Sequence, residues 1–278
     1  MAPGGLSRAP LVANLGLPAL ADAIDLNQPW FAPWAPWLVE PLKALRRGCS
    51  VAQALNQTLL AFGPGHAAQG LRFVPQTHLP PGAAYEAFIH RTRQVPTRDN
   101  LHDLFNGVCW LRFPVIKRHL NALQTEQIDR LGVGQIRGAV RDALTLMDEN
   151  ALLLSGPEPL RLALQAHDWH GLFVRHRDLW TRAHPVLFGH ALLEKLVRPY
   201  KSITAHVFWV DGPEGGGQTG PIDHDAMLEH ALPERLCAPH LATKPFMPLP
   251  VLGLPGWSLE NETPDFYADQ AVFRPGRR

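Results

Sequence analysis

Apolar residues recur along this chain in two rhythms, a helical one of three to four residues and a shorter, extended one. Ser50 precedes the run VAQALNQTLLAF and offers the side-chain oxygen that caps a helix, while Gly63 follows that run. Pro114 ends one apolar run and suits the first turn of the next, because proline disrupts a helix interior. Helices are therefore predicted at 37–47, 51–62, 100–112, 115–131, 157–167, 169–180, 190–197 and 223–236.

The extended segments are fewer and shorter than the helices. SITAHVFWV at 202–210 is rich in β-branched and aromatic residues, which favour strands. RDALTLM at 141–147 and ALLLS at 151–155 are predicted to be two strands, joined by a tight turn at 148–150. Other extended segments are predicted at 71–75, 84–91 and 185–189.

These elements predict an α+β fold, a mostly helical single domain with a small mixed or antiparallel sheet and an extended C-terminal arm. Residues 1–26 are expected to be a weakly structured N-terminal segment, and residues 27–236 to form the domain. The Pro-rich stretch 237–278 is expected to wrap the same domain as an extended arm. GPEGGGQTG at 212–220 is predicted to be a flexible loop. The expected anchors of the arm are Trp257, Phe266, Tyr267 and Phe273.

Composition narrows the class of protein. The formal net charge is +1 and the basic runs are short, so no nucleic-acid partner is indicated. Cys49, Cys109 and Cys237 are widely spaced, which is typical of a reduced protein and predicts a cytoplasmic location. No uninterrupted apolar run approaches the length of a membrane span, so no membrane partner is expected. The expected partner is an unidentified small molecule or protein.

The predicted helix that starts near Asn100 carries the most informative polar residues. It is apolar on nearly every side, which is typical of a buried helix. His102, Asp103 and Asn106 then need partners inside the protein, because an unpaired polar group is costly to bury. Arg98 and Arg141 are the two candidate partners for Asp103. The pattern fits either a structural hydrogen-bond network or a ligand-binding or catalytic site.

Further polar residues lie next to predicted elements elsewhere in the chain. His190 and Glu194 are one helical turn apart, a spacing at which two side chains can share a metal ion or a hydrogen bond. His206 lies on one face of the strand at 202–210, where a histidine is usually a satisfied core residue. The acidic and amide side chains of the predicted turn could brace that turn or project into a site; these residues are Asp148, Glu149 and Asn150.

Several motifs occur in a fixed order along the chain. They are TRDNLHDLFN, RDALTLMDEN, FGHALLEKL and FYADQAVFRP. In these the chain resembles a bacterial, mainly proteobacterial family known as a domain of unknown function, over roughly 27–274. The resemblance implies a single-domain soluble protein, and it implies no activity.

The leading functional hypothesis is a metal-assisted hydrolase that acts on a phosphoester or amide-like substrate. A bound Zn, Mn or Fe ion would lower the pKa of an attacking water molecule. The alternative is a non-catalytic cytoplasmic binding or scaffold protein whose polar motifs are hydrogen-bond networks. The expected metal ligands are His102, His190 and Glu194, with His206 in reserve, and the expected general base or orienting residue is Asp103 or Glu149.

Overall fold

The computed structural model describes residues 16–132, 138–211 and 223–276, so the predicted loop at 212–220 lies outside the described residues. Most of the described chain is helical, as predicted. The helices are α1 (Leu17–Asp22), α2 (Ala35–Arg46), α3 (Val51–Phe62), α4 (Tyr85–Thr92), α5 (Leu101–Arg112), α6 (Pro114–Leu131), α7 (Ala139–Asn150), α8 (Glu158–Gln165), α9 (His190–Leu196), α10 (His224–Arg235) and α11 (Ala238–Ala242).

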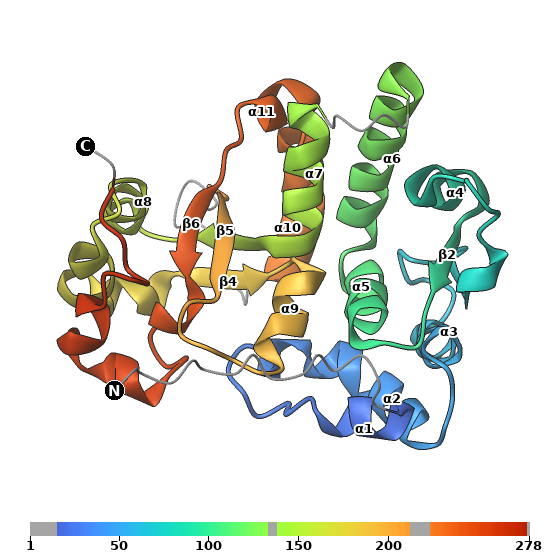
Figure 1. The fold of residues 1–278 in the computed structure, drawn as a ribbon, viewed down its shortest axis with the longest axis horizontal. Coiled ribbons are helices and arrows are strands. Elements are labelled where there is room, and N and C mark those ends of the chain that lie inside the picture. Colours follow the sequence, from blue (N-terminus) through green and yellow to red (C-terminus); the bar gives the residue numbers. More distant parts are fainter. Residues whose placement is uncertain (1–15, 133–137, 212–222, 277–278) are drawn as a thin grey trace, which may run out of the picture.

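Two small sheets complete the fold, and the α+β prediction is confirmed. Helices α1 to α6 lie on one side of the molecule and the larger sheet on the other, with α7 and α9 between them (Figure 1). The strands are β1 (Arg72–Pro75), β2 (Gln94–Thr97), β3 (Ala151–Ser155), β4 (His184–Leu187), β5 (Thr204–Trp209) and β6 (Met247–Pro250).

The larger sheet has the strand order β4-β3-β5-β6 and is mixed, as the sequence predicts. Strand β3 pairs with β5 in parallel, whereas β3–β4 and β5–β6 are antiparallel. All five residues of β3 are buried, so it forms the centre of this half of the core. Helix α9 connects β4 to β5, and it therefore starts at the edge of the sheet next to the end of α7.

The smaller sheet is a parallel pair of β1 and β2, and α4 is the crossover between them. The prediction of an extended segment at 84–91 was wrong, because this stretch is α4. Ala87, Phe88 and Ile89 are its buried residues, and α4 packs against α6. Tertiary packing outweighed the extended appearance of this short stretch.

The predicted strand at 141–147 and turn at 148–150 were also wrong. Both belong to α7, which ends only at Asn150. Ala143, Leu144 and Met147 are buried on one face at helical spacing, whereas a strand would alternate. The acidic residues Asp148 and Glu149 therefore lie on the last turn of a helix and not at the tip of a hairpin.

Helix α5 lies at the centre of the helical half of the core. Leu104, Phe105, Val108 and Leu111 are fully buried, and Phe31 stacks on Phe105 with ring centroids 5.8 Å apart. Asn100 caps the helix by accepting a hydrogen bond from the backbone N–H of Asp103. This burial confirms the prediction that the polar residues of α5 face partners inside the protein.

The C-terminal residues complete both the sheet and an aromatic cluster. Strand β6 pairs with β5, and the rings of Tyr267 and Phe273 pack against Phe173. Phe266 is buried beside them, and Trp257 contacts Trp30 with ring centroids 5.9 Å apart. None of the helices in the described residues has both the length and the apolarity that crossing a membrane requires.

At Gly189, just before α9, the backbone lies very close to the backbone at the end of α7. Substitution of Gly189 tests how much stability depends on this close approach. A Cβ at Gly189 would lie 2.4 Å from the carbonyl oxygen of Glu149, closer than real contacts allow. We expect Gly189→Ala to lower the free energy of unfolding by about 1–3 kcal/mol, because the backbones must move apart. Urea denaturation measures this difference. Gly65→Ala is the control, since a Cβ there meets nothing within 4 Å; equal losses in both variants would contradict the steric explanation.

Candidate functional site

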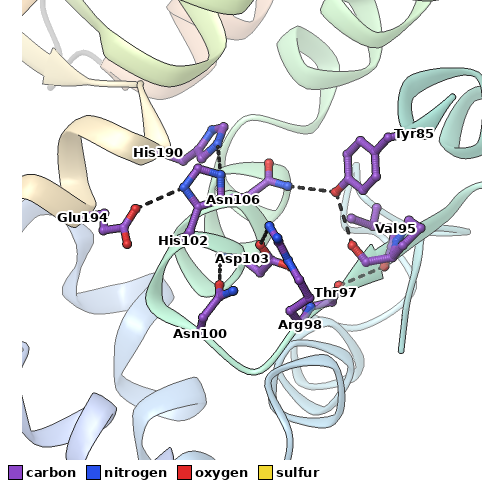
Figure 2. A network of polar contacts seen from close by, with 11 residues as sticks. Tyr85, Val95, Thr97, Arg98, Asn100, His102, Asp103, Asn106, His190 and Glu194 are labelled. Atoms are coloured by element: carbon purple, nitrogen blue, oxygen red, sulfur yellow. Dashed lines mark hydrogen bonds and ion pairs between the residues drawn. The ribbon is translucent and has the colours of Figure 1, made fainter. Parts of the chain in front are cut away.

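The start of α5 is fixed by an ion pair between Arg98 and Asp103. The backbone N–H of Arg98 donates to Asp103 Oδ2 at 2.6 Å, and its guanidinium donates to both carboxylate oxygens at 3.1 and 2.8 Å. Figure 2 shows this pair beside the cap residue Asn100. The carboxylate of Asp103 is therefore fully engaged in positioning α5, as the sequence suggested for Arg98.

Next to Asp103, the imidazole of His102 points across to α9. Its Nδ1 lies 3.0 Å from Glu194 Oε2, so the carboxylate accepts a hydrogen bond from the ring (Figure 2). Glu194 is therefore paired with His102, and not with His190 one turn away on its own helix. Glu194 instead joins α9 to α5 across 92 positions of sequence.

The second nitrogen of His102 meets a second histidine. His190 Nε2 lies 3.1 Å from His102 Nε2, and the two rings approach at 77° with centroids 4.5 Å apart (Figure 2). The side chain of His190 is buried, whereas that of His102 is about one-third exposed. Two ring nitrogens from distant segments therefore converge at a position near the protein surface.

Behind His190 lies a second carboxylate. Nδ1 of His190 is 3.7 Å from Asp148 Oδ2, which is too far for a hydrogen bond but close enough for the carboxylate charge to act on the ring. The other oxygen of Asp148 binds the ammonium group of Lys117, which also donates to Asn106 Oδ1 at 2.9 Å. Lys117 is only 3 % exposed, so its charge depends on Asp148 for compensation.

Asn106 extends the network toward β2. Its side-chain amide donates to the hydroxyl of Tyr85 at 3.1 Å, and that hydroxyl donates to the carbonyl of Pro96 at 3.3 Å (Figure 2). Burial, together with the nearby carboxylates of Asp103 and Asp148, raises the pKa of Tyr85 well above its usual value. Tyr85 is therefore a neutral hydrogen-bonding group at all pH values at which the protein would be studied.

The environments of the two histidines push their pKa values apart. The hydrogen bond that His102 donates to Glu194 raises the pKa of His102, despite partial burial. Burial lowers the pKa of His190 to about 4, although Asp148 opposes this shift. Burial would also raise the pKa of Asp148, but Lys117 and His190 outweigh it and hold that pKa below its usual value. At neutral pH in the absence of another cation, any shared proton therefore lies on His102.

A small cavity adjoins this network between α4, α5, α6 and α7. Its volume is about 80 Å³, enough for a few water molecules. Asp148 borders the cavity on one side and faces His190 on the other. The cavity walls include Tyr85, Glu86, Asn106, Trp110, Lys117, Asn121, Gln124, Thr145, Asp148 and Glu149.

The structure brings most of the predicted site residues together, but not all of them. His206 pairs with Ala151 in the sheet, and its buried Nδ1 has no hydrogen-bond partner among the described residues. Asn150 accepts a hydrogen bond from Lys195 at 2.8 Å and stays outside the network. In the described part of the chain, no three His, Cys, Asp or Glu residues form a group that could hold a metal ion. The residues that converge are His102, Asn106, Asp148, His190 and Glu194, and Glu149 joins them at the cavity.

Two members of the network are absent from the predicted site residues, Lys117 and Tyr85. A signal for Lys117 exists, because it directly follows the buried Ile116 and comes shortly before the buried Leu120, on a helix that begins in the core. A lysine in such a position needs a buried carboxylate. No comparable signal exists for Tyr85, since its helix was predicted to be an extended segment.

The pair of Lys117 and Asp148 provides a test of how the network holds the fold. We expect Lys117→Met to lower the free energy of unfolding by about 3 kcal/mol, because it leaves a mostly buried carboxylate without its cation. Asp148 is 30 % exposed, which places the expected loss at the lower end of the range for buried pairs. Denaturant unfolding of Lys117→Met, Asp148→Asn and the double variant measures the coupling.

The same measurement on an exposed pair supplies the control. Lys43 and Glu40 lie 2.8 Å apart, and each is more than half exposed, so Lys43→Met should change stability little. If the double variant at 117 and 148 were as unstable as the sum of its single variants, the two residues would not be coupled.

Comparison with known proteins places the chain in a family. The model of a protein family described as "Protein of unknown function (DUF3025)" matches residues 71–277, which include every residue of the network. No curated protein and no solved structure matches the chain. Because the matched region covers most of the chain, the protein belongs to this family of unknown function, DUF3025.

Proposed function

We propose that this protein is a metal-assisted hydrolase whose centre lies between His102 and His190. The observation that supports this proposal is the 3.1 Å distance between the two Nε2 atoms. Each ring has a carboxylate behind it at Nδ1, Glu194 for His102 and Asp148 for His190. The hydrogen-bonded pair of Glu194 and His102 is of the kind that commonly orients a histidine ligand of a metal ion, whereas Asp148 acts on His190 through its charge alone.

The carboxylates decide which nitrogen of each ring carries its proton. A carboxylate in front of Nδ1 favours a proton on Nδ1, which leaves the lone pair on Nε2. Both histidines would then direct lone pairs at the same small region, where they repel unless a cation lies between them. A proton held by His102 meets this need in the isolated protein, and a divalent metal ion meets it with two bonds.

The distance between the nitrogens fits the metal. Two histidine nitrogens bound to tetrahedral Zn²⁺ at their usual bond lengths are about 3.3 Å apart. The observed 3.1 Å corresponds to Zn–N bonds of about 1.9 Å, within about 0.2 Å of the usual bond length. The protein supplies two ligands here, so water and substrate would occupy the remaining positions, and the ion would bind more weakly than in a site with three protein ligands.

The surrounding carboxylates differ in their freedom to act on a bound water. Asp103 is held by three hydrogen bonds from Arg98, so it serves as a structural residue in this proposal. Glu149 borders the cavity, and within the described residues its carboxylate forms no ion pair. Its charge also contributes to raising the pKa of His102. We therefore assign Glu149 the role of general base, which would accept a proton from the attacking water.

A second candidate is a non-catalytic binding or scaffold protein. The observation that favours it is that Arg98, Asp103 and Asn106 are all satisfied by local partners. In that case the histidine pair would only join α5 to α9. The two candidates differ in what happens when one histidine is removed, because a structural pair contributes to stability and a metal site contributes to metal binding.

The decisive measurement is the metal content of untagged protein after dialysis against Zn²⁺ or Mn²⁺, determined by elemental mass spectrometry. We expect about one ion per chain in the wild type and almost none in His102→Ala or His190→Ala, since each removes one of the two ligands. The bound ion should also raise the unfolding temperature of the wild type, because it binds the folded state preferentially.

His206→Ala is the matched control, because it removes a partly buried histidine that lies outside the pair. It should bind metal as the wild type does. A wild type that takes up no metal and shows no thermal shift, together with His190→Ala that is strongly destabilised, would overturn the hydrolase proposal in favour of the scaffold. If metal binds, a screen of phosphoester and amide substrates, with Glu149→Gln as the inactive reference, identifies the reaction.

A further inference from the structure

The cavity between α4, α5, α6 and α7 carries information about the substrate. It lies on the far side of Asp148 from His190, so the cavity and the histidine pair share that residue as a common wall. Asn106, one helical turn after His102, also borders it. Neither histidine lines the cavity. A substrate that reaches the proposed centre would therefore extend past Asp148 and Asn106 and place only one end in the cavity.

The positively charged side chain in the cavity wall is already paired with a carboxylate. Lys117 is its only lysine or arginine among the residues that the structure assigns to the walls. Its ammonium group binds Asp148 and Asn106 and lies 5.4 Å from the centre of the Trp110 ring. An incoming anion would have to compete with the carboxylate of Asp148 for this ammonium group, in a place where no second cation lines the cavity.

The negative charge of the cavity, in contrast, is in excess. Besides Asp148, the walls hold Glu86 on α4 and Glu149 on α7. Both side chains are half-buried, and neither forms an ion pair within the described part of the chain. With Asp148 matched by Lys117, two carboxylates remain without a cation to balance them.

The rest of the wall suits a small group that donates hydrogen bonds. The amide N–H groups of Asn121 and Gln124 are engaged with the Glu86 carbonyl and the Thr145 hydroxyl, which leaves their amide oxygens as acceptors. Tyr85 and Trp110 provide aromatic surface, and aromatic rings attract cations. The same kinds of group already bind one ammonium group in this cavity, because Lys117 is held there by a carboxylate, an amide oxygen and an indole ring.

We propose that this cavity binds the primary ammonium group of a small substrate. The proposal rests on the proposed function for the reaction, and it narrows the substrate class from phosphoesters and amides to amides that carry a free amine. A phosphoester would bring one or two negative charges toward two unbalanced carboxylates. An ammonium group balances them and donates three hydrogen bonds to the oxygens of the wall. In this proposal Glu86 is its direct carboxylate partner, and Glu149, the proposed general base, attracts it through its charge. The small size of the cavity limits this end of the substrate to a few non-hydrogen atoms.

The test uses ethylammonium chloride as the probe, with sodium phosphate and sodium acetate as comparison salts at equal ionic strength. Binding is measured by ligand-observed NMR on the full chain. We expect saturable binding of ethylammonium to the wild type and none of phosphate or acetate. Glu149→Gln and Glu86→Gln should each weaken ethylammonium binding about tenfold, because each removes one charge while keeping the shape of the side chain.

Glu126→Gln is the matched control, because Glu126 is an exposed residue on α6 that lies outside the cavity. It should bind ethylammonium as the wild type does, and all variants should unfold at the wild-type denaturant concentration. Binding of phosphate, or ethylammonium binding that is unchanged in both cavity variants, would overturn the proposal. If a cavity variant does not fold, the comparison of ethylammonium with phosphate still tests the proposal, because it uses only the wild type.

The same experiment separates this inference from the hydrolase proposal. His102→Ala and His190→Ala remove the proposed metal ligands but leave the residues of the cavity in place, so they should retain ethylammonium binding. A protein that binds ethylammonium but no metal would refute the hydrolase proposal alone. A protein that binds metal but no ethylammonium would refute the assignment of the substrate class alone.

Discussion

The rest of the structure depends on one constraint, the burial of α5 on nearly every side. Each polar side chain on this helix must find a partner inside the protein, because burying it unpaired would cost more than most single contacts contribute. Asp103 is satisfied by Arg98, His102 by Glu194, and Asn106 by Tyr85 and Lys117. These partners come from the segment before α5 and from α9, α4 and α6, so the needs of one helix determine how four other segments are arranged.

The chain of contacts that results is electrostatically ordered. Lys117 keeps Asp148 charged, and Asp148 in turn faces the buried His190. On the other side, Glu194 raises the pKa of His102. Two histidines in contact thus have opposite tendencies to hold a proton, one set by burial and the other by a carboxylate. The two rings differ because His190 is buried, whereas His102 is partly exposed and bonded to Glu194. This difference requires no unusual backbone geometry.

Part of this arrangement could be predicted from the sequence, and the reason lies in which signals are local. The burial of α5 follows from its apolar periodicity, whereas the sequence left Arg98 and Arg141 as alternative partners of Asp103, of which the structure shows Arg98. The contact of His102 with His190 depends on the packing of α5 against α9, which no local pattern records. The segment 141–147 was misassigned because its short run of Leu and Thr resembles a strand, whereas burial at helical spacing appears only once β3 and α9 are in place.

The wide separation of the site residues along the sequence has a consequence for how the site forms during folding. His102 and His190 are separated by 88 positions, and Lys117 and Asp148 by 31. Contacts between residues so far apart form late, because closing long loops costs conformational entropy before any contact stabilises the chain. An N-terminal fragment that ends before α9 lacks both His190 and Glu194, the two contacts of the His102 ring. The histidine pair can thus assemble only after α9 has been added to the chain.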